Sequence, residues 1–205
     1  MSLLKKLLHY LRSRRKISEM TVDEAIDHLV SHSLSQSLIY FENSFFRRAS
    51  RFSKQSKTRQ DTYFYEILAS NLVVTKLLLA DYARAKDNPE VKKIAASLFA
   101  GFFNKQREHN VPEETARDWQ KLFKAKEKEA LRLIKIMKDS ALKSDDQKMQ
   151  LMLEMPENFI IRAASCDCLN YFTQEGRALP EDQKFADWIL QIHIDIFRFL
   201  KKSLT

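Results

Sequence analysis

The feature that most constrains this chain is its shortage of glycine: 205 residues contain 2 glycines, Gly101 and Gly176. Glycine supplies the positive φ of tight turns, and two-residue β-hairpins favour Asn-Gly or Asp-Gly, neither of which occurs here. The sequence also contains no glycine-rich phosphate-binding loop, no dinucleotide fingerprint and no Gly-x-Ser-x-Gly nucleophile elbow. The chain is therefore expected to be all-α and to lack these catalytic and cofactor motifs.

Helix starts are marked by four Pro-Glu pairs and two capping boxes. Proline suits the first helical position because its missing N–H would be unpaired there, and glutamate favours the positive end of the helix dipole. The pairs begin at Pro89, Pro112, Pro156 and Pro180, and the capping boxes are Thr21–Glu24 and Ser144–Gln147. With the 3.6-residue apolar spacing, they predict a single-domain helical bundle or array of about eight helices. We expect these at residues 3–16, 21–52, 61–86, 89–109, 112–142, 145–155, 157–175 and 181–202, with a break near 53–60.

Two of these helices differ in the distribution of their apolar residues. In residues 112–142 lysines cover much of one face, and the other face is apolar: Trp119, Leu122, Phe123, Ala130, Leu133, Ile134 and Met137. In residues 181–202 the isoleucines alternate with polar residues as in a strand, but a helical stripe through Trp188, Ile192, Ile196 and Phe199 also fits. The absence of other strand signals favours a helix that is apolar almost all round. We expect it to be largely buried, in the core or in a homo-oligomer interface.

Positive charge is concentrated in two segments that contain no acidic residue. Residues 1–16 include Lys5, Lys6, Arg12, Arg14, Arg15 and Lys16, and residues 47–59 include Arg47, Arg48, Arg51, Lys54, Lys57 and Arg59. Because the whole chain has a net charge of +8, the rest of it is acidic on balance. A partner attracted by charge is expected to meet these segments.

Residues 47–59 form the first candidate site, for an anion or a partner. On a continuous helix Arg47, Arg51 and Lys54 would line up, with phenylalanines at 45, 46 and 52 beside them. Such a surface can hold phosphates while aromatic rings stack on bases. An acidic protein or a lipid surface would fit the same charges. The alternative is a solvated helix end whose phenylalanines are buried.

Residues 1–18 form the second candidate surface, a basic amphipathic N-terminal helix that precedes the all-helical domain 19–205. Its apolar stripe is Leu3, Leu4, Leu7, Leu8 and Leu11, and basic residues fill the remainder. This pattern is typical of a helix that lies on an anionic membrane surface. It also fits a mitochondrial transit peptide or an ordinary first helix whose leucines pack on the core.

Metal and thiol chemistry have weaker signals. Glu24, His28 and His32 recur along one helix face, but no HExxH or ExxH motif accompanies them, so we interpret the histidines as exposed or core-edge residues. Cys166 and Cys168 point about 200° apart on a helix, which predicts that at least one is a small core residue. Two reduced thiols suit a cytoplasmic protein. We expect no metal site, no cofactor and no membrane-spanning segment.

Residues 3–46 resemble the DNA-binding end of TetR-type repressors. Thr21-Val22-Asp23-Glu24 matches the start of that family's second helix, and Leu38-Ile39-Tyr40-Phe41 matches its recognition helix. The family's turn glycine is missing, with His32-Ser33-Leu34-Ser35 in its place, and the spacing between the two matches is longer. The resemblance implies a helix-turn-helix transcriptional regulator that uses residues 1–60.

No arrangement of nucleophile, base and orienting residue can be located from spacing, so we expect a protein that is not an enzyme. The main hypothesis is a cytoplasmic protein-interaction module, an adaptor, chaperone-like or scaffold protein, or a component of a larger complex. Fourteen phenylalanines indicate a large aromatic core and an apolar groove able to take a partner helix. The basic segments would steer an acidic partner. The alternatives are a nucleic-acid-binding protein and a peripheral membrane protein.

Overall fold

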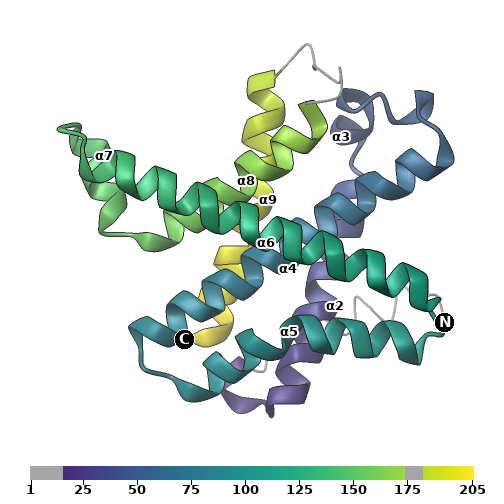
Figure 1. Ribbon diagram of the computed structural model, residues 1–205, viewed down its shortest axis with the longest axis horizontal. Coiled ribbons are helices and arrows are strands. Elements are labelled where there is room, and N and C mark those ends of the chain that lie inside the picture. Colours follow the sequence, from purple (N-terminus) through teal and green to yellow (C-terminus); the bar gives the residue numbers. More distant parts are fainter. Residues whose placement is uncertain (1–15, 174–181) are drawn as a thin grey trace.

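The computed structural model describes residues 16–173 and 182–205, and these residues are helical almost throughout (Figure 1). The 3₁₀ turns are η1 (Ile17–Glu19) and η2 (Phe52–Lys54). The α-helices are α2 (Val22–Phe41), α3 (Ser44–Ala49), α4 (Lys57–Ala85), α5 (Pro89–Glu108), α6 (Glu113–Leu142), α7 (Gln147–Leu153), α8 (Pro156–Thr173) and α9 (Asp182–Leu204). No strand occurs in the described ranges, so the all-α prediction is confirmed. The helix predicted at 3–16 and the Pro180-Glu181 pair lie outside these ranges.

Most helix starts follow the local signals. Pro89 and Pro156 are the first residues of α5 and α8, and Pro112 immediately precedes α6. Thr21 caps α2 in a complete capping box with Glu24. The box predicted at Ser144–Gln147 is wrong, because Asp146 is the cap and its side chain accepts a hydrogen bond from the Lys148 N–H at 2.7 Å. A carboxylate next to the helix outcompetes a hydroxyl two residues further away.

The helix predicted at 21–52 is wrong, because the chain breaks after α2. Asn43 takes an extended conformation, and its side-chain oxygen accepts hydrogen bonds from the N–H groups of Phe45 and Phe46. This cap starts the short helix α3. A second break follows, where Arg51 takes a left-handed conformation with φ of 50°. Ser56 then caps α4, so the break lies near its predicted place but ends earlier.

α4 is the central element of the fold, and α2, α5, α6, α8 and α9 all pack against it (Figure 1). The buried side chains form a large aliphatic cluster around α2, α4 and α5 and an aromatic cluster at the α3 end. Among the described residues α4 is also the one helix long and apolar enough to cross a membrane, and 78% of its apolar window is buried inside the protein. This burial is what a core helix of a globular fold requires.

The C-terminal helix α9 packs one face into the core, but the expectation of a helix that is apolar almost all round is wrong, because its other face is polar and exposed. Phe185, Ile189, Ile192, Ile196 and Leu200 are in the core, while Gln191 and Arg198 are exposed. The strand-like alternation of isoleucines therefore belongs to a helix. Ile194, the middle isoleucine of that alternation, is half-buried at the edge of the packed face.

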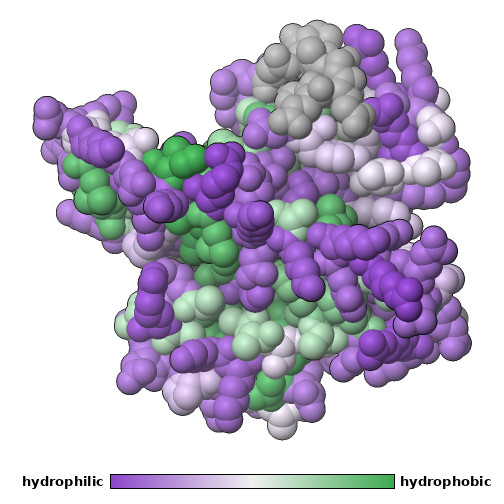
Figure 2. All heavy atoms as spheres, in the orientation of Figure 1, coloured by the Kyte–Doolittle hydropathy of each residue, from purple (hydrophilic) through white to green (hydrophobic). Residues whose placement is uncertain are grey.

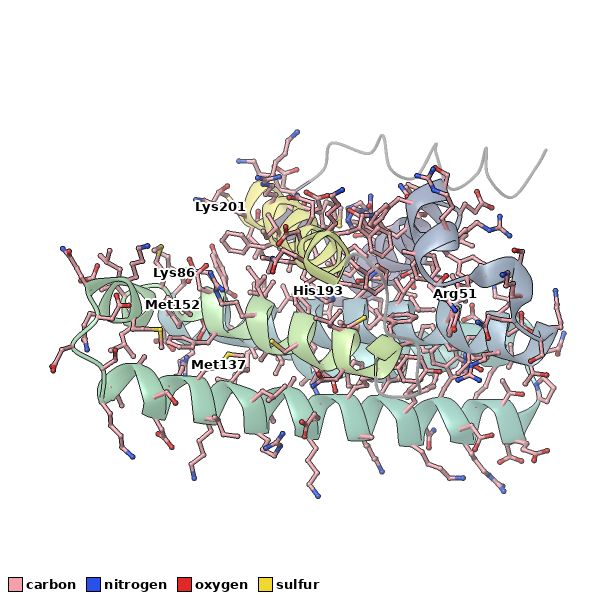
Figure 3. The ribbon with its side chains drawn as sticks, turned by 90° about the horizontal axis from the view of Figure 1, so that it is seen from above. Arg51, Lys86, Met137, Met152, His193 and Lys201 are labelled. Atoms are coloured by element: carbon pink, nitrogen blue, oxygen red, sulfur yellow. The ribbon has the colours of Figure 1, made fainter. Side chains whose placement is uncertain are left out.

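α6 and α8 extend away from the other helices and carry α7 at their far end (Figure 1). Large apolar side chains are exposed here: Leu131, Ile136, Leu142, Leu151 and Met155. Figure 2 shows hydrophobic residues gathered over the half of α6 nearest to α7. Figure 3 labels Met137 on α6 and Met152 on α7, which lie between these two elements.

Candidate functional site

Four of the six candidate basic residues in 47–59 come together around one surface hollow. This basic hollow has a volume of about 790 Å³ and is lined by Arg47, Arg48, Arg51, Phe52, Ser53, Lys54 and Gln60. Lys57 and Arg59 lie instead in the first turn of α4. The grouping does not come from one helix face, as predicted, because α3 ends at Ala49. The turn at Arg51 brings the side chains together.

The walls of the basic hollow are held by side chains. The Arg47 guanidinium lies over the Phe52 ring at 4.4 Å from its centroid, a cation–π contact. Gln60 donates through Nε2 to the carbonyl oxygens of Phe52, at 3.2 Å, and Gln55, at 3.1 Å. α3, η2 and the first turns of α4 are thus tied into one unit.

The phenylalanines near the basic hollow are not free to stack on bases. Phe46 is fully buried and Phe52 is 5% exposed, both within the aromatic cluster. Phe45 is half-buried and packs against Trp188. The interpretation of buried phenylalanines beside a charged surface is therefore the one that fits the structure.

A second hollow, which we call the apolar groove, lies between α2, α4, α5 and α6. Its volume is about 640 Å³. The lining residues are mostly aliphatic and aromatic: Val30, Leu34, Leu38, Phe64, Tyr65, Leu68, Phe102, Val111 and Trp119. The polar ones include Ser31, Lys105, Gln106, His109 and Thr115. Lys105 is already paired with Asp27 at 2.9 Å, so little charge faces the groove.

Gln106, one of the polar residues that line the apolar groove, has an unpaired hydrogen-bond acceptor. Its Oε1 atom is buried and has no hydrogen-bond partner among the described residues. A buried acceptor without a donor is costly, and in folded proteins such atoms are uncommon. The atom is not accessible from the groove, so a molecule bound there could donate to it only after the Gln106 side chain rotates.

The apolar groove and the basic hollow are neighbours. Phe41, the last residue of α2, contacts Phe64 in the groove wall at 5.5 Å between ring centroids and Phe52 in the hollow wall at 5.0 Å. Leu38, one turn before Phe41, lines the groove. Phe41 therefore connects the wall of the apolar groove to the wall of the basic hollow.

A third polar group of side chains lies in the interior. His193 on α9 is between Ser70 on α4 and Ser165 on α8, with Ser70 Oγ 2.9 Å from Nε2 and Ser165 Oγ 2.8 Å from Nδ1. Ser165 donates its hydroxyl proton to the Ile161 carbonyl, so Nδ1 carries the ring proton and Nε2 accepts from Ser70. Figure 3 shows His193 facing inward from α9.

In this arrangement a serine hydroxyl donates to a histidine, as a nucleophile does to its general base, but the group is enclosed. His193 is 1% exposed and Ser70 is 2% exposed, and neither lines the apolar groove or the basic hollow. Burial lowers the pKa of His193 to about 3, so the ring is neutral near pH 7. A substrate has no route to it through either surface.

Next to this group, Lys126 of α6 is buried between two carboxylates. Its ammonium forms ion pairs with Glu66 of α4 and with Asp167 of α8, the latter at 2.8 Å. Sequence reasoning did not single out Lys126, because its partners come from two other helices. The lysine-rich composition of α6 gives no signal that one lysine points inward.

The other candidates occupy structural positions. His28 and His32 are buried at the core edge, and His32 stacks on Phe199 with ring centroids 3.4 Å apart. Burial, and then the neighbouring His28, lower the pKa of His32 to about 4. Among the described residues no group of side chains could hold a metal ion. Cys166 is half-buried and Cys168 is buried, both as free thiols.

Two predictions about the N-terminal part can be compared with the structure. Residues 32–35 lie within the continuous helix α2, so the turn that the TetR-type resemblance implies does not occur there. Of the basic N-terminal residues, Lys16 is described, and its ammonium donates to the Thr205 carbonyl oxygen at 2.6 Å. Lys5, Lys6, Arg12, Arg14 and Arg15 lie outside the described residues.

Comparisons with known proteins add no relative: no family model, no curated protein and no solved structure matches this chain.

Proposed function

We propose that this protein is a non-enzymatic interaction module whose apolar groove binds a helical segment of another protein. The observation that carries the proposal is the groove itself, an open apolar hollow between four helices with one buried, unpaired acceptor at Gln106. An amphipathic helix that lays its apolar face into such a groove is a common mode of peptide recognition. It would fit an adaptor, a chaperone-like protein or a scaffold.

The spacing of the groove residues supports a helical occupant. Leu34 and Leu38 are half-buried, lie one turn apart on α2 and form a short ridge about 6 Å long at 1.5 Å per residue, while Val30, one turn earlier, is fully buried. A ridge of this kind packs against the corresponding groove of a facing helix. Phe64 and Trp119 supply aromatic side walls of the type enriched at interfaces.

The distribution of polar groups supports a binding role over a catalytic one. Ser31 and His109 both line the groove, but no hydrogen bond joins them, and the serine–histidine hydrogen bonds among the described residues are enclosed around His193. General acid–base catalysis needs a titratable group within hydrogen-bond reach of the substrate. Apolar contact, by contrast, needs only what the groove offers.

The basic hollow supports an acidic partner. Four cationic side chains line it, in one of the two basic segments of a chain that is acidic on balance outside them. Complementary charge speeds association and selects the orientation in which a partner binds. An acidic end of the partner helix, next to its apolar stripe, would meet both features.

The test is capture of partners from lysate by tagged protein at 0.5 M salt after nuclease treatment, followed by titration of the purified partner. Leu38→Asp places a charge in the groove and should weaken binding by about 30-fold or more, from the lost apolar contact alone. Thr115→Arg blocks the groove without removing an apolar side chain and should have the same effect. Leu131→Asp, at a side chain 50% exposed outside the groove, is the matched control and should bind normally.

Other outcomes would contradict the proposal. If the partner binds both groove variants as tightly as the wild type, the groove is not the interface. If only nuclease-sensitive material is captured, and is released by salt, the nucleic-acid alternative takes its place.

A further inference from the structure

We propose that the basic hollow is a phosphate site, which binds a phosphomonoester group carried by a partner protein. The phosphate chemistry follows from the hollow alone. The further claim, that a partner protein carries the phosphate, rests on the proposed function. The two parts can therefore fail separately in an experiment.

The positive charge of the basic hollow is uncompensated by the described residues. Arg47, Arg48, Arg51 and Lys54 are all exposed and line the same hollow. None of the four forms an ion pair with a carboxylate of the described residues. Some surface cations are paired locally, as Lys121 is with Asp118 at 3.1 Å, and others, such as Lys93, are unpaired among the described residues but lie outside this hollow. Four like charges around one hollow repel each other, and an anion placed between them relieves that repulsion.

The backbone of the basic hollow is strained at Arg51. Three described non-glycine residues have positive φ: Arg51 at 50°, Asp87 at 46° and Asn110 at 55°. Aspartate and asparagine tolerate the left-handed region, whereas a long side chain is uncommon there. Strained residues that the surroundings hold in place occur preferentially at binding sites. Glycine would adopt this backbone conformation without strain, whereas arginine adds a cationic side chain to the hollow.

The basic hollow is held in shape before any ligand binds. Arg47 is placed by its contact with the Phe52 ring, and Gln60 fixes the turn through two carbonyl groups. Arginine side chains that are already positioned lose less freedom when they form hydrogen bonds. The site is therefore able to bind a small anion and not only to attract one.

The ligand that fits best is a phosphomonoester. It has a charge near −2 and three acceptor oxygens, and the guanidinium fork matches this geometry. A nucleic-acid strand would need an extended basic track and rings free to stack on bases. Here the cations gather at one place, and Phe52 is 5% exposed. A phosphorylated serine or threonine beside an apolar helix suits both the hollow and the adjoining groove.

The test is a titration of the full chain with inorganic phosphate, and separately with O-phosphoserine, at constant ionic strength. The readout is the Nε–H resonances of the arginine side chains. We expect saturating shifts at Arg47, Arg48 and Arg51, and binding of O-phosphoserine roughly tenfold or more tighter than that of serine or chloride, because hydrogen bonds to charged groups are strong.

Two variants remove the site and one serves as a control. Arg51→Gly takes away a guanidinium while glycine adopts the same backbone, so phosphate affinity should fall about tenfold with no loss of thermal stability. Lys54→Gln should act in the same direction. Lys93→Gln, at an exposed lysine on α5, should leave the titration unchanged.

Each remaining outcome overturns the proposal or one part of it. Shifts that grow linearly without saturation, or an unchanged affinity in Arg51→Gly and Lys54→Gln, would show that the hollow is only a charged surface. A further outcome is that an oligothymidylate without a terminal phosphate binds more tightly than O-phosphoserine and loses this binding in the same two variants. That result would show that the hollow binds nucleic acid and not a phosphorylated protein. Loss of phosphate binding in Leu38→Asp, which changes the groove and none of the residues that line the hollow, would show that the hollow alone does not bind phosphate.

Discussion

Lys126 shows how one buried charge can stabilise three helices at once. It is 8% exposed, and its partners Glu66 and Asp167 belong to α4 and α8. Lys126→Met leaves the Glu66 carboxylate buried without a cation, which should lower the free energy of unfolding by about 3–5 kcal/mol. Urea denaturation measures the loss.

Two further variants separate the buried pair from an ordinary surface pair. Lys121→Met removes an exposed lysine of the same helix, whose partner is Asp118, and should change stability far less. The double variant Glu66→Gln/Lys126→Met should recover most of the stability. Equal losses in Lys126→Met and Lys121→Met would mean that the interior pair is not important.

His193 makes the fold sensitive to mild acid. Burial lowers its pKa to about 3, whereas in the unfolded chain it titrates near 6.5. As pH falls below 6.5, His193 binds a proton in the unfolded chain but stays neutral in the folded one, so the free energy of unfolding decreases. At pH 5 the loss from this one residue is about 2 kcal/mol relative to pH 7.5.

The variant that isolates this effect is His193→Gln. It is expected to be less stable than the wild type at pH 7.5, because Ser70 and Ser165 lose their partner. Its stability should fall less steeply between pH 7.5 and pH 5, by about 2 kcal/mol, since no buried ring remains to titrate. Parallel pH profiles for the two proteins would contradict the account.

At the scale of single residues, the sequence predicted the burial of side chains better than it predicted which side chains contact each other. The burial of a cysteine was correctly expected from the pattern, whereas His28 and His32, which are buried, were expected to be either exposed or at the core edge. The ion pairs of Lys126 were not predicted, because residues 66, 126 and 167 meet only after the helices pack. Periodicity describes which side of a helix is apolar, and it carries no information on what faces that side.

At the scale of elements, Gly101 sets how closely α5 approaches α2. A Cβ atom at this position would overlap Cγ2 of Ile26, a side chain that is 5% exposed. Helix propensity alone predicts that Gly101→Ala stabilises the protein by about 1 kcal/mol. We expect the opposite, a net loss of about 1–3 kcal/mol, because the β-branched Ile26 cannot move aside without repacking.

The measurement is the midpoint of thermal or urea unfolding. Ala100→Gly, at the exposed neighbour, is the control for propensity and should cost about 1 kcal/mol. A rise in stability for Gly101→Ala would show that α2 and α5 are not in close contact there.

Helix boundaries followed local chemistry where that chemistry was strong. Proline at 89 and 156 and the Thr21 capping box act within one turn, so the sequence was sufficient to place them. The break between α2 and α3 was missed because it depends on one side chain, Asn43, in a stretch with continuous helical spacing. The arrangement of the helices around α4 has no local signal at all.

At the scale of the whole molecule, the two binding features arise from elements distant in the sequence. Residues between 30 and 119 meet to form the apolar groove, while the basic hollow comes from one short segment. The basic residues were therefore found from the sequence, although their helical alignment was wrong. The groove was expected only as a general consequence of many phenylalanines, and none of its lining residues was named.

The central claim is that a helix of another protein lies in the apolar groove, and site-specific photo-crosslinking in cells tests it most directly. A photoreactive phenylalanine analogue is placed at position 38 in the groove and, as a control, at position 131 on the exposed part of α6. The account predicts crosslinks to a discrete partner from position 38 alone, at a peptide with apolar residues at helical spacing and acidic or phosphorylated residues at one end. No crosslinks from position 38, or the same adducts from both positions, would contradict it.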